Sequence, residues 1–240
     1  MEINDRKNRE EIMDRVLSAG HGTMLVSSRS KILLWKFTIK FSYFLKRLLD
    51  ILVSGTALLV ALPFFIMLGI AIRIESRGPV IFTQKRVGKD GRHFKFYKFR
   101  SMVSDAEKLK DKLVQENESK DGVIFKMKKD PRITKIGAFI RKFSIDELPQ
   151  LLNVLIGDMS LVGPRPPVPR EVAEYTLEDR KRLHAKPGIT CTWQISGRSD
   201  IPFKIQAELD KEYIRSKSFW KDIRILLLTI PAVITGKGAY

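Results

Sequence analysis

The chain has 240 residues, 44% of them hydrophobic, so it can bury a core in one domain, or in one domain plus a membrane anchor. A net charge of +17 favours anionic partners: nucleic acid, an acidic membrane face or phosphorylated substrates. The single cysteine, Cys191, excludes an internal disulfide, and the three histidines lack the spacing of zinc ligands.

The first part of the chain changes from polar to aromatic. Residues 1 to about 22 are polar and of mixed charge, which fits either a short surface helix or a loose segment. Residues 31–50, KILLWKFTIKFSYFLKRLLD, mix aromatic residues with lysines, and both kinds of side chain find partners in the headgroup layer of a membrane. We interpret residues 1–43 as an N-terminal extension and an interfacial segment. The local pattern of the aromatic stretch fits a helix and a strand equally.

Residues 51–72 carry no charged side chain and would reach about 33 Å as a straight helix, enough to cross the hydrocarbon layer of a membrane. The stretch begins too late and is too long for a cleavable signal peptide. Pro63 near its middle should kink or break the helix. Basic residues at both ends resist translocation: Lys36, Lys40, Lys46 and Arg47 before it, and Arg73, Arg77, Lys85 and Arg86 after it.

Two membrane topologies are compatible with this segment. A helix that enters the bilayer, turns at Pro63 and returns to the same side satisfies both the proline and the flanking charges. A kinked helix that spans the membrane fits the residues equally well, because proline is tolerated in such helices.

Residues 79–102 have the pattern of a β-hairpin, with β-branched and aromatic residues alternating with polar ones around an Asp-Gly turn at residues 90–91. Lys98 and Arg100 fall on the same strand face as Phe94 and Phe96. This face is either a solvated edge with protective lysines or a cationic shelf, and the pattern alone favours the edge. A charged surface helix is expected to follow over residues 104–122.

Two adjacent carboxylates, Asp146 and Glu147, precede an apolar stretch. Because Pro149 belongs in the first turn of a helix, the helix should begin near Asp146, whose carboxylate would then be kept ionised by free backbone N–H groups. In an alternative frame, Ser144 caps the helix and Glu147 closes a capping box. Arg141 and Arg165 lie in the same module, so the pattern indicates metal-assisted phosphoryl chemistry.

A series of segments closely resembles the bacterial sugar transferase family, the monotopic polyprenyl-phosphate phosphoglycosyl transferases. The resemblance covers about residues 44–240 in order. It is carried by KRLLD at residue 46, the proline-containing apolar segment, PVIFTQKRVG, FYKFRSM, DPRIT, SIDELPQLLNVLIGDMSLVGPRPP, KPGITCTWQISGRSD and GKGAY.

The resemblance implies that a sugar 1-phosphate moves from a nucleoside diphosphate sugar to a polyprenyl phosphate, with Mg²⁺ required. Asp146 would be the nucleophile and would form an aspartyl phosphosugar intermediate, while Glu147 would help bind Mg²⁺. Other side chains are then candidates for holding phosphate, sugar or nucleotide: Arg165, Arg141, Lys98 and, more weakly, Arg100 for phosphate oxygens, and Gln194 and Arg198 for sugar or nucleotide. The ending GRSD resembles members that move hexose phosphates.

The implied substrates are a UDP-sugar and undecaprenyl phosphate, with UMP released, on the cytoplasmic face of the bacterial inner membrane. Membrane phospholipids are further expected partners, and no binding of nucleic acid is expected. A homodimer is compatible with the resemblance. The expected fold is α+β, mainly helical with a small β-hairpin, in a monotopic protein. A re-entrant helix region broken at Pro63 would occupy residues 44–78, where Leu62 replaces a serine found in some relatives. Residues 79–240 would form the catalytic domain with interfacial amphipathic helices, the last of which ends or bends near Pro231.

Overall fold

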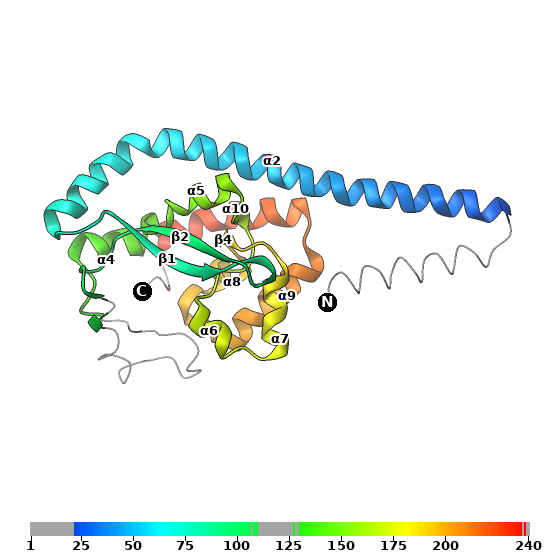
Figure 1. The fold of residues 1–240 in the computed structure, drawn as a ribbon. Coiled ribbons are helices and arrows are strands. Elements are labelled where there is room, and N and C mark those ends of the chain that lie inside the picture. Colours follow the sequence, from blue (N-terminus) through cyan, green and yellow to red (C-terminus); the bar gives the residue numbers. More distant parts are fainter. Residues whose placement is uncertain (1–21, 107, 110–126, 128–129, 237, 239–240) are drawn as a thin grey trace. The chain divides into compact units, whose positions relative to one another are not determined.

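The computed structural model describes residues 22–106, 108–109, 127, 130–236 and 238 (Figure 1). Two compact units are present, residues 1–46 and residues 47–240. The predictions for residues 1–21, and most of the helix expected over residues 104–122, lie outside the described residues.

The interfacial segment of the first unit is helical, as part of helix α2 (Gly22–Glu75). Its aromatic side chains are well exposed, with 57% of Trp35 and 66% of Phe37 accessible. The rings of Phe37 and Phe41 stack one helical turn apart, with their centroids 5.9 Å from each other. The ambiguity between helix and strand is thus resolved, and the segment presents an apolar surface.

The second part of α2, within the second unit, remains helical through Pro63. Pro63 was expected to kink or break this helix. The break is wrong, because α2 is continuous, and Figure 1 shows the helix curving over this cyan part. The segment Lys31–Glu75 is long and apolar enough to cross a membrane by length and composition, and an 18-residue window within it has a mean hydropathy of 2.4. One proline removes only one hydrogen bond of such a helix, and the remaining bonds keep it continuous.

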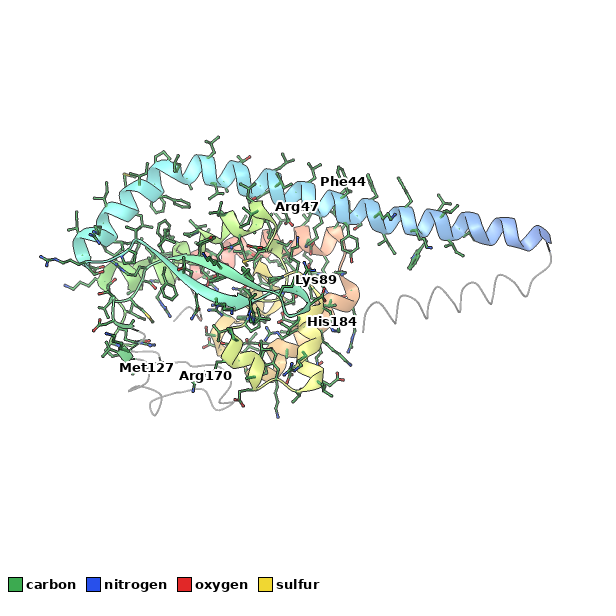
Figure 2. All side chains as sticks on the ribbon, in the orientation of Figure 1. Phe44, Arg47, Lys89, Met127, Arg170 and His184 are labelled. Carbon is green, nitrogen blue, oxygen red and sulfur yellow. The ribbon has the colours of Figure 1, made fainter. Side chains whose placement is uncertain are left out.

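Arg47 and Asp50 are among the charged residues that join α2 to the rest of the second unit. Arg47 donates hydrogen bonds to the carbonyls of Val154 (2.6 Å) and Leu155 (2.8 Å), near the end of helix α5 (Gln150–Ile156). Figure 2 labels Arg47 on the side of the helix that faces α5. Asp50 is buried, and its Oδ1 accepts hydrogen bonds from the Ser160 hydroxyl (3.1 Å) and the Leu161 amide (2.9 Å).

We expect the Asp50→Ala substitution to lower the free energy of unfolding by about 2 kcal/mol, because it leaves a buried hydroxyl and a buried amide without their acceptor. Denaturant unfolding of the detergent-solubilised protein measures this loss. Asp158→Ala is the matched control, since Asp158 is exposed and should change stability by less than about 0.5 kcal/mol. Equal losses in the two variants would contradict an anchoring role for Asp50.

The predicted hairpin is confirmed. Strands β1 (Ile81–Val87) and β2 (His93–Phe99) pair antiparallel, with Ile81 opposite Phe99 and Val87 opposite His93. The turn between them uses the positive φ angles of Asp90 (55°) and Gly91 (80°), which Asp and Gly tolerate better than other residues. Because side chains alternate along a strand, one face of the hairpin carries its even-numbered residues from both strands.

Helix α4 (Lys135–Lys142) packs closely against the chain just beyond β2. Thr134 caps it by accepting a hydrogen bond from the Gly137 amide. A Cβ atom at Gly137 would lie only 1.9 Å from the carbonyl oxygen of Ser101, so glycine is required for this approach. The C-terminal end of α4, which carries Arg141, is thereby held beside the hairpin.

Neither predicted frame for the helix after Ser144 is correct. Ser144 has a left-handed φ of 53° and makes no capping bond, and residues Ile145–Glu147 form a 3-10 turn. Helix α5 begins only at Gln150, with Pro149 as its N-cap residue. Asp146 and Glu147 therefore precede the helix, on a separate turn that follows a sharp change of chain direction.

The remaining elements form a second sheet and its helical cover. Strands β3 (Ser160–Val162) and β4 (Gly188–Thr190) pair parallel. The other helices, in chain order, are α6 (Pro169–Ala173), α7 (Leu177–Arg180), α8 (Thr192–Ser196), α9 (Phe203–Ser216) and α10 (Phe219–Thr235).

Helix α10 is amphipathic, as predicted. Pro231 was expected to end or bend it, and the end is wrong, because the helix continues past this residue. Its Ile225 is buried in the core, whereas a second apolar stripe is exposed. The exposed residues fall close together at helical spacing: Trp220, Leu227, Ile230 and Ile234. The described residues thus form a mainly helical α+β fold with a small antiparallel hairpin.

Candidate active site

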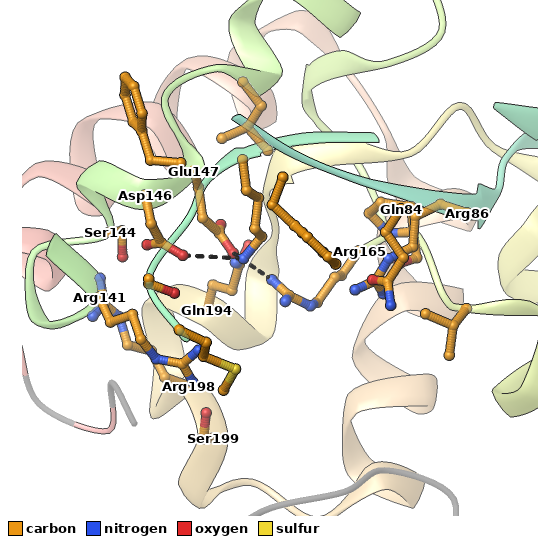
Figure 3. Close-up of a pocket in the computed structure, with 18 of the residues that line it drawn as sticks. Gln84, Arg86, Arg141, Ser144, Asp146, Glu147, Arg165, Gln194, Arg198 and Ser199 are labelled. Atoms are coloured by element: carbon orange, nitrogen blue, oxygen red, sulfur yellow. Dashed lines mark hydrogen bonds and ion pairs between the residues drawn. The ribbon is translucent and has the colours of Figure 1, made fainter. Parts of the chain in front are cut away.

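A cavity of about 690 Å³ opens beside the hairpin (Figure 3), within the range of roughly 300–1,000 Å³ usual for small-molecule sites. The 3-10 turn, the proline-rich loop after β3 and helix α8 contribute to its wall. Nine of the described lining residues are Arg or Lys and four are Asp or Glu. The cavity therefore suits an anionic ligand.

Four of the predicted site residues meet in one ion-paired cluster. The Lys98 ammonium lies 2.6 Å from Oε1 of Glu147 and 3.3 Å from Oδ2 of Asp146. Arg165 donates from Nη1 to the same Glu147 oxygen at 3.0 Å. The structure thus brings together residues from β2, from the 3-10 turn and from the loop after β3. The face of the hairpin that carries Lys98 is a cationic shelf rather than a solvated edge.

The two carboxylates of the pair have opposite pKa shifts. Burial raises the pKa of the Asp146 carboxyl above its ordinary value; Lys98 opposes the rise and the Glu147 charge adds to it. Burial also acts to raise the pKa of Glu147, but Lys98 and Arg165 outweigh it and hold that pKa well below its usual range. Such divergence between neighbouring acids is typical of groups with separate chemical roles.

Asp146 was expected at a helix N-cap, where free backbone amides would keep its carboxylate ionised, and this is wrong. Pro149 is the N-cap residue of α5, and burial is the largest influence on the pKa of the Asp146 carboxyl. Its stabilising partners are the positive charges of Lys98 and Arg141.

Arg141 and Arg198 lie beside Asp146 at one end of the cavity (Figure 3). The Arg141 side chain makes no hydrogen bond or ion pair with any residue that the structure describes, so it can bind an incoming anion without first breaking a contact. Arg198 has a left-handed φ of 54°, and its Nη1 is buried without a partner among the described residues.

Gln194 also lines the cavity, from α8. The thiol of Cys191 donates to its Oε1 at 3.2 Å. Burial raises the pKa of this thiol well above its ordinary value, as expected for a packing residue rather than a nucleophile.

Arg100 has a different environment from the other cations. Its Nη2 donates to the Ser76 hydroxyl at 2.9 Å and also binds the carbonyl oxygens of Ser76 and Ile72, at the end of α2. Only 6% of the residue is accessible. In this structure its guanidinium is engaged with the backbone of α2, although the residue also borders the cavity.

Sequence reasoning missed four arginines of the cavity wall: Arg86, Arg132, Arg170 and Arg182. Arg86 belongs to β1, and Arg182 is held at the cavity wall by a buried ion pair with Asp210. The signal for Arg86 was available: in the hairpin register it lies opposite Phe94, on the same face as Lys98. Arg182 gave no comparable signal, because its partner lies 28 positions away in the chain.

The carboxylate pair fits a Mg²⁺ ion that arrives with a phosphorylated substrate. Among the described residues there is no group of three or more His, Cys, Asp or Glu that could hold a metal. Mg²⁺ needs no such group, because it usually binds one or two carboxylates together with substrate phosphates and water. Both cations on Glu147 bind its Oε1, which leaves Oε2 for a metal.

A buried, ion-paired carboxylate couple at the edge of a cationic cavity defines an enzyme site for an anionic substrate. Comparison with known proteins gives the family. The model of the bacterial sugar transferases matches residues 41–236, and the chain belongs to this family.

Three relatives illustrate the match. Galactosyl transferase CpsE of Streptococcus agalactiae is 52% identical over 202 residues, covering 83% of this chain and 44% of CpsE. The undecaprenyl-phosphate galactose phosphotransferase of Salmonella typhimurium is 44% identical, over 83% of this chain and 42% of its own length. A UDP-galactose-lipid carrier transferase of Erwinia amylovora is 42% identical, with the same two coverages. The chain thus spans less than half the length of these relatives.

Proposed function

We propose that the protein transfers a hexose 1-phosphate from a UDP-sugar to undecaprenyl phosphate, with release of UMP, as a membrane step of polysaccharide or glycoconjugate synthesis. The observation that carries the proposal is the buried couple of Asp146 and Glu147, held by Lys98 and Arg165 in a cationic cavity. The names of the Salmonella and Erwinia relatives, which mention undecaprenyl phosphate, galactose and a UDP-sugar, support the choice of substrates.

In the first step, a carboxylate oxygen of Asp146 attacks the phosphorus atom that bears the sugar. An O–P bond forms to Asp146, the bond from this phosphorus to the bridging oxygen breaks, and UMP leaves with the electron pair. Two anionic substrates would repel each other in a direct transfer, and a covalent intermediate separates them in time. Lys98 places a positive charge 3.3 Å from the attacking carboxylate, and so keeps part of it ionised despite burial.

In the second step, a phosphate oxygen of undecaprenyl phosphate attacks the same phosphorus. The bond to Asp146 breaks, the carboxylate is restored, and the product is the sugar diphospholipid. The side chain of Arg141, which has no partner among the residues that the structure describes, lies beside Asp146 at the same end of the cavity (Figure 3). We assign to it the neutralisation of the phosphate that is being transferred.

In this proposal Glu147 would hold Mg²⁺, which would supply positive charge to polarise the phosphate and to stabilise the leaving group. The low pKa of Glu147 keeps this ligand ionised over the whole physiological range. Arg165 positions Glu147 through its hydrogen bond, and its other guanidinium nitrogens, which make no hydrogen bond to the described residues, would bind phosphate.

The long apolar helix α2 places the site at a membrane in this proposal. Its exposed side chains include many large apolar residues. The flanking basic residues favour a course with both ends on the cytoplasmic face, which the unbroken helix would follow by its curvature (Figure 1) and not by a break at Pro63. The exposed stripe of α10 provides a second apolar contact, suited to the interface of the bilayer. Arg100 serves to hold the end of α2 rather than a substrate phosphate.

The proposal is tested with a panel of nucleotide sugars, undecaprenyl phosphate and Mg²⁺, with monophosphate release and labelled lipid as readouts. We expect UMP to appear with UDP-galactose or UDP-glucose, together with one equivalent of sugar diphospholipid. Omission of the lipid should limit UMP release to about one equivalent per active site, since the intermediate then has no acceptor. Failure of every nucleotide sugar to release a monophosphate would contradict the proposed function.

A further inference from the structure

Arg86 occupies the end of the cavity opposite to Arg141. Figure 3 shows Asp146 and Arg141 at one end, Arg165 in the middle, and Arg86 with Gln84 beyond it. The Arg86 guanidinium lies over the ring of Phe96, 5.0 Å from its centroid, and donates from Nη1 to the Pro166 carbonyl at 2.9 Å. The backbone on either side of Arg86 is held by strand pairing, so this cation has a fixed position.

The charge of Arg86 is incompletely compensated by the protein. It forms no ion pair with the residues that the structure describes, and its buried Nε has no hydrogen-bond partner there. Burial and the neighbouring Arg165 lower its pKa to about 10, against the weaker attraction of Glu171 and Glu147. Two arginines that repel each other across a cavity are stabilised when an anion binds between them.

The in-line geometry of the proposed reaction requires a phosphate at the end of the cavity where Arg86 lies. Phosphoryl transfer proceeds with the attacking and leaving oxygens roughly in line. Because the attack comes from Asp146, the leaving oxygen must lie on the far side of the transferred phosphorus. Figure 3 shows Arg165 and then Arg86 along the cavity from Asp146, so we place the leaving oxygen on that side.

We propose that Arg86, together with Arg165, forms a subsite for the phosphate that stands in line with Asp146, first that of the departing nucleoside monophosphate and then that of the lipid acceptor. The subsite rests on the proposed function. The same in-line requirement applies to both steps, since the acceptor oxygen must attack opposite the bond to Asp146. One subsite therefore serves both phosphates in alternation, and UMP and undecaprenyl phosphate exclude each other from it.

The test compares binding of UMP and of uridine, which lacks the phosphate, to the solubilised full chain. Arg86→Gln is expected to weaken UMP binding roughly tenfold or more, through the loss of a charge-assisted contact, and to leave uridine binding unchanged. Lys85→Gln removes the same charge from the neighbouring, exposed position on the opposite face of β1 and should change neither affinity. Arg86→Lys should be intermediate, because it retains the charge without the planar fork.

Two results would overturn the subsite. Unchanged UMP affinity in Arg86→Gln would show that Arg86 does not contact phosphate, and equal loss of UMP and uridine binding would show that it only supports the loop at Pro166. Turnover of the wild type is measured in parallel. Release of UMP by the wild type together with either result refutes the subsite alone, whereas no release from any UDP-sugar refutes the proposed function and the subsite with it.

Discussion

The Asp146→Asn enzyme is expected to form no phosphosugar adduct and to lose about a thousandfold or more in turnover, since an amide cannot replace an anionic nucleophile. Intact-mass measurement after incubation with the UDP-sugar, without lipid, tests this directly. The wild type should gain the mass of one sugar phosphate, and peptide mapping should place it on Asp146. The isosteric change leaves packing nearly unaltered, so a loss of activity reports on chemistry.

Asp158→Asn is the matched control for this experiment. Asp158 lies just beyond α5 and is exposed, so its substitution should leave both adduct and turnover close to the wild type. An adduct on another side chain, or product formation by the wild type without any trapped adduct on position 146, would exclude Asp146 as the nucleophile.

The Lys98→Met enzyme is expected to lose about ten- to a hundredfold in kcat/KM at neutral pH, and the acidic limb of its pH profile should move to higher pH. Lys98 lowers the pKa of both Asp146 and Glu147. Its removal therefore raises the already elevated pKa of Asp146 and reduces the fraction of ionised nucleophile. Part of the lost rate should return as the pH is increased.

A profile of kcat/KM against pH separates this electrostatic effect from a general loss of structure. Lys98→Arg should keep the acidic limb near its wild-type position, because it retains the positive charge. Lys95→Met provides the control on the opposite, exposed face of β2 and should leave the profile unchanged. An unshifted limb in Lys98→Met would mean that Lys98 does not set the ionisation of Asp146.

The features that sequence predicted well depend on local patterns. The hairpin follows from the Asp-Gly turn at residues 90–91 and from alternation along each strand, both of which are short-range properties. The two carboxylates were found because they adjoin each other beside a proline and near Arg165. The resemblance of the chain to the bacterial sugar transferase family then implied a role for each of them that spacing alone does not define.

The features that sequence missed depend on contacts between distant segments. Ser144 has a left-handed conformation, and helix α5 begins only at Gln150 and not near Asp146 as expected. Helix-capping rules do not predict such a turn. Asp50 bonds to residues about 110 positions away, and Arg86 approaches Pro166 across 80. Pro63 was expected to kink or break its helix and Pro231 to end or bend its own. Neither helix is broken, because the remaining hydrogen bonds and packing of each helix outweigh one lost bond.

The attachment of Arg100 to the last turn of α2 has a consequence for the proposed location in a membrane. Through the bonds of Arg100 to Ser76 and Ile72, the end of α2 is connected to the chain just after strand β2, and Lys98 lies two residues before Arg100. In the proposed membrane location, a displacement or tilt of α2 would therefore be passed on to the carboxylate couple. Bilayer thickness would then set how far an isoprenoid headgroup must rise to reach the nucleophile, and the rate of lipid glycosylation would depend on the acyl chains of the host membrane.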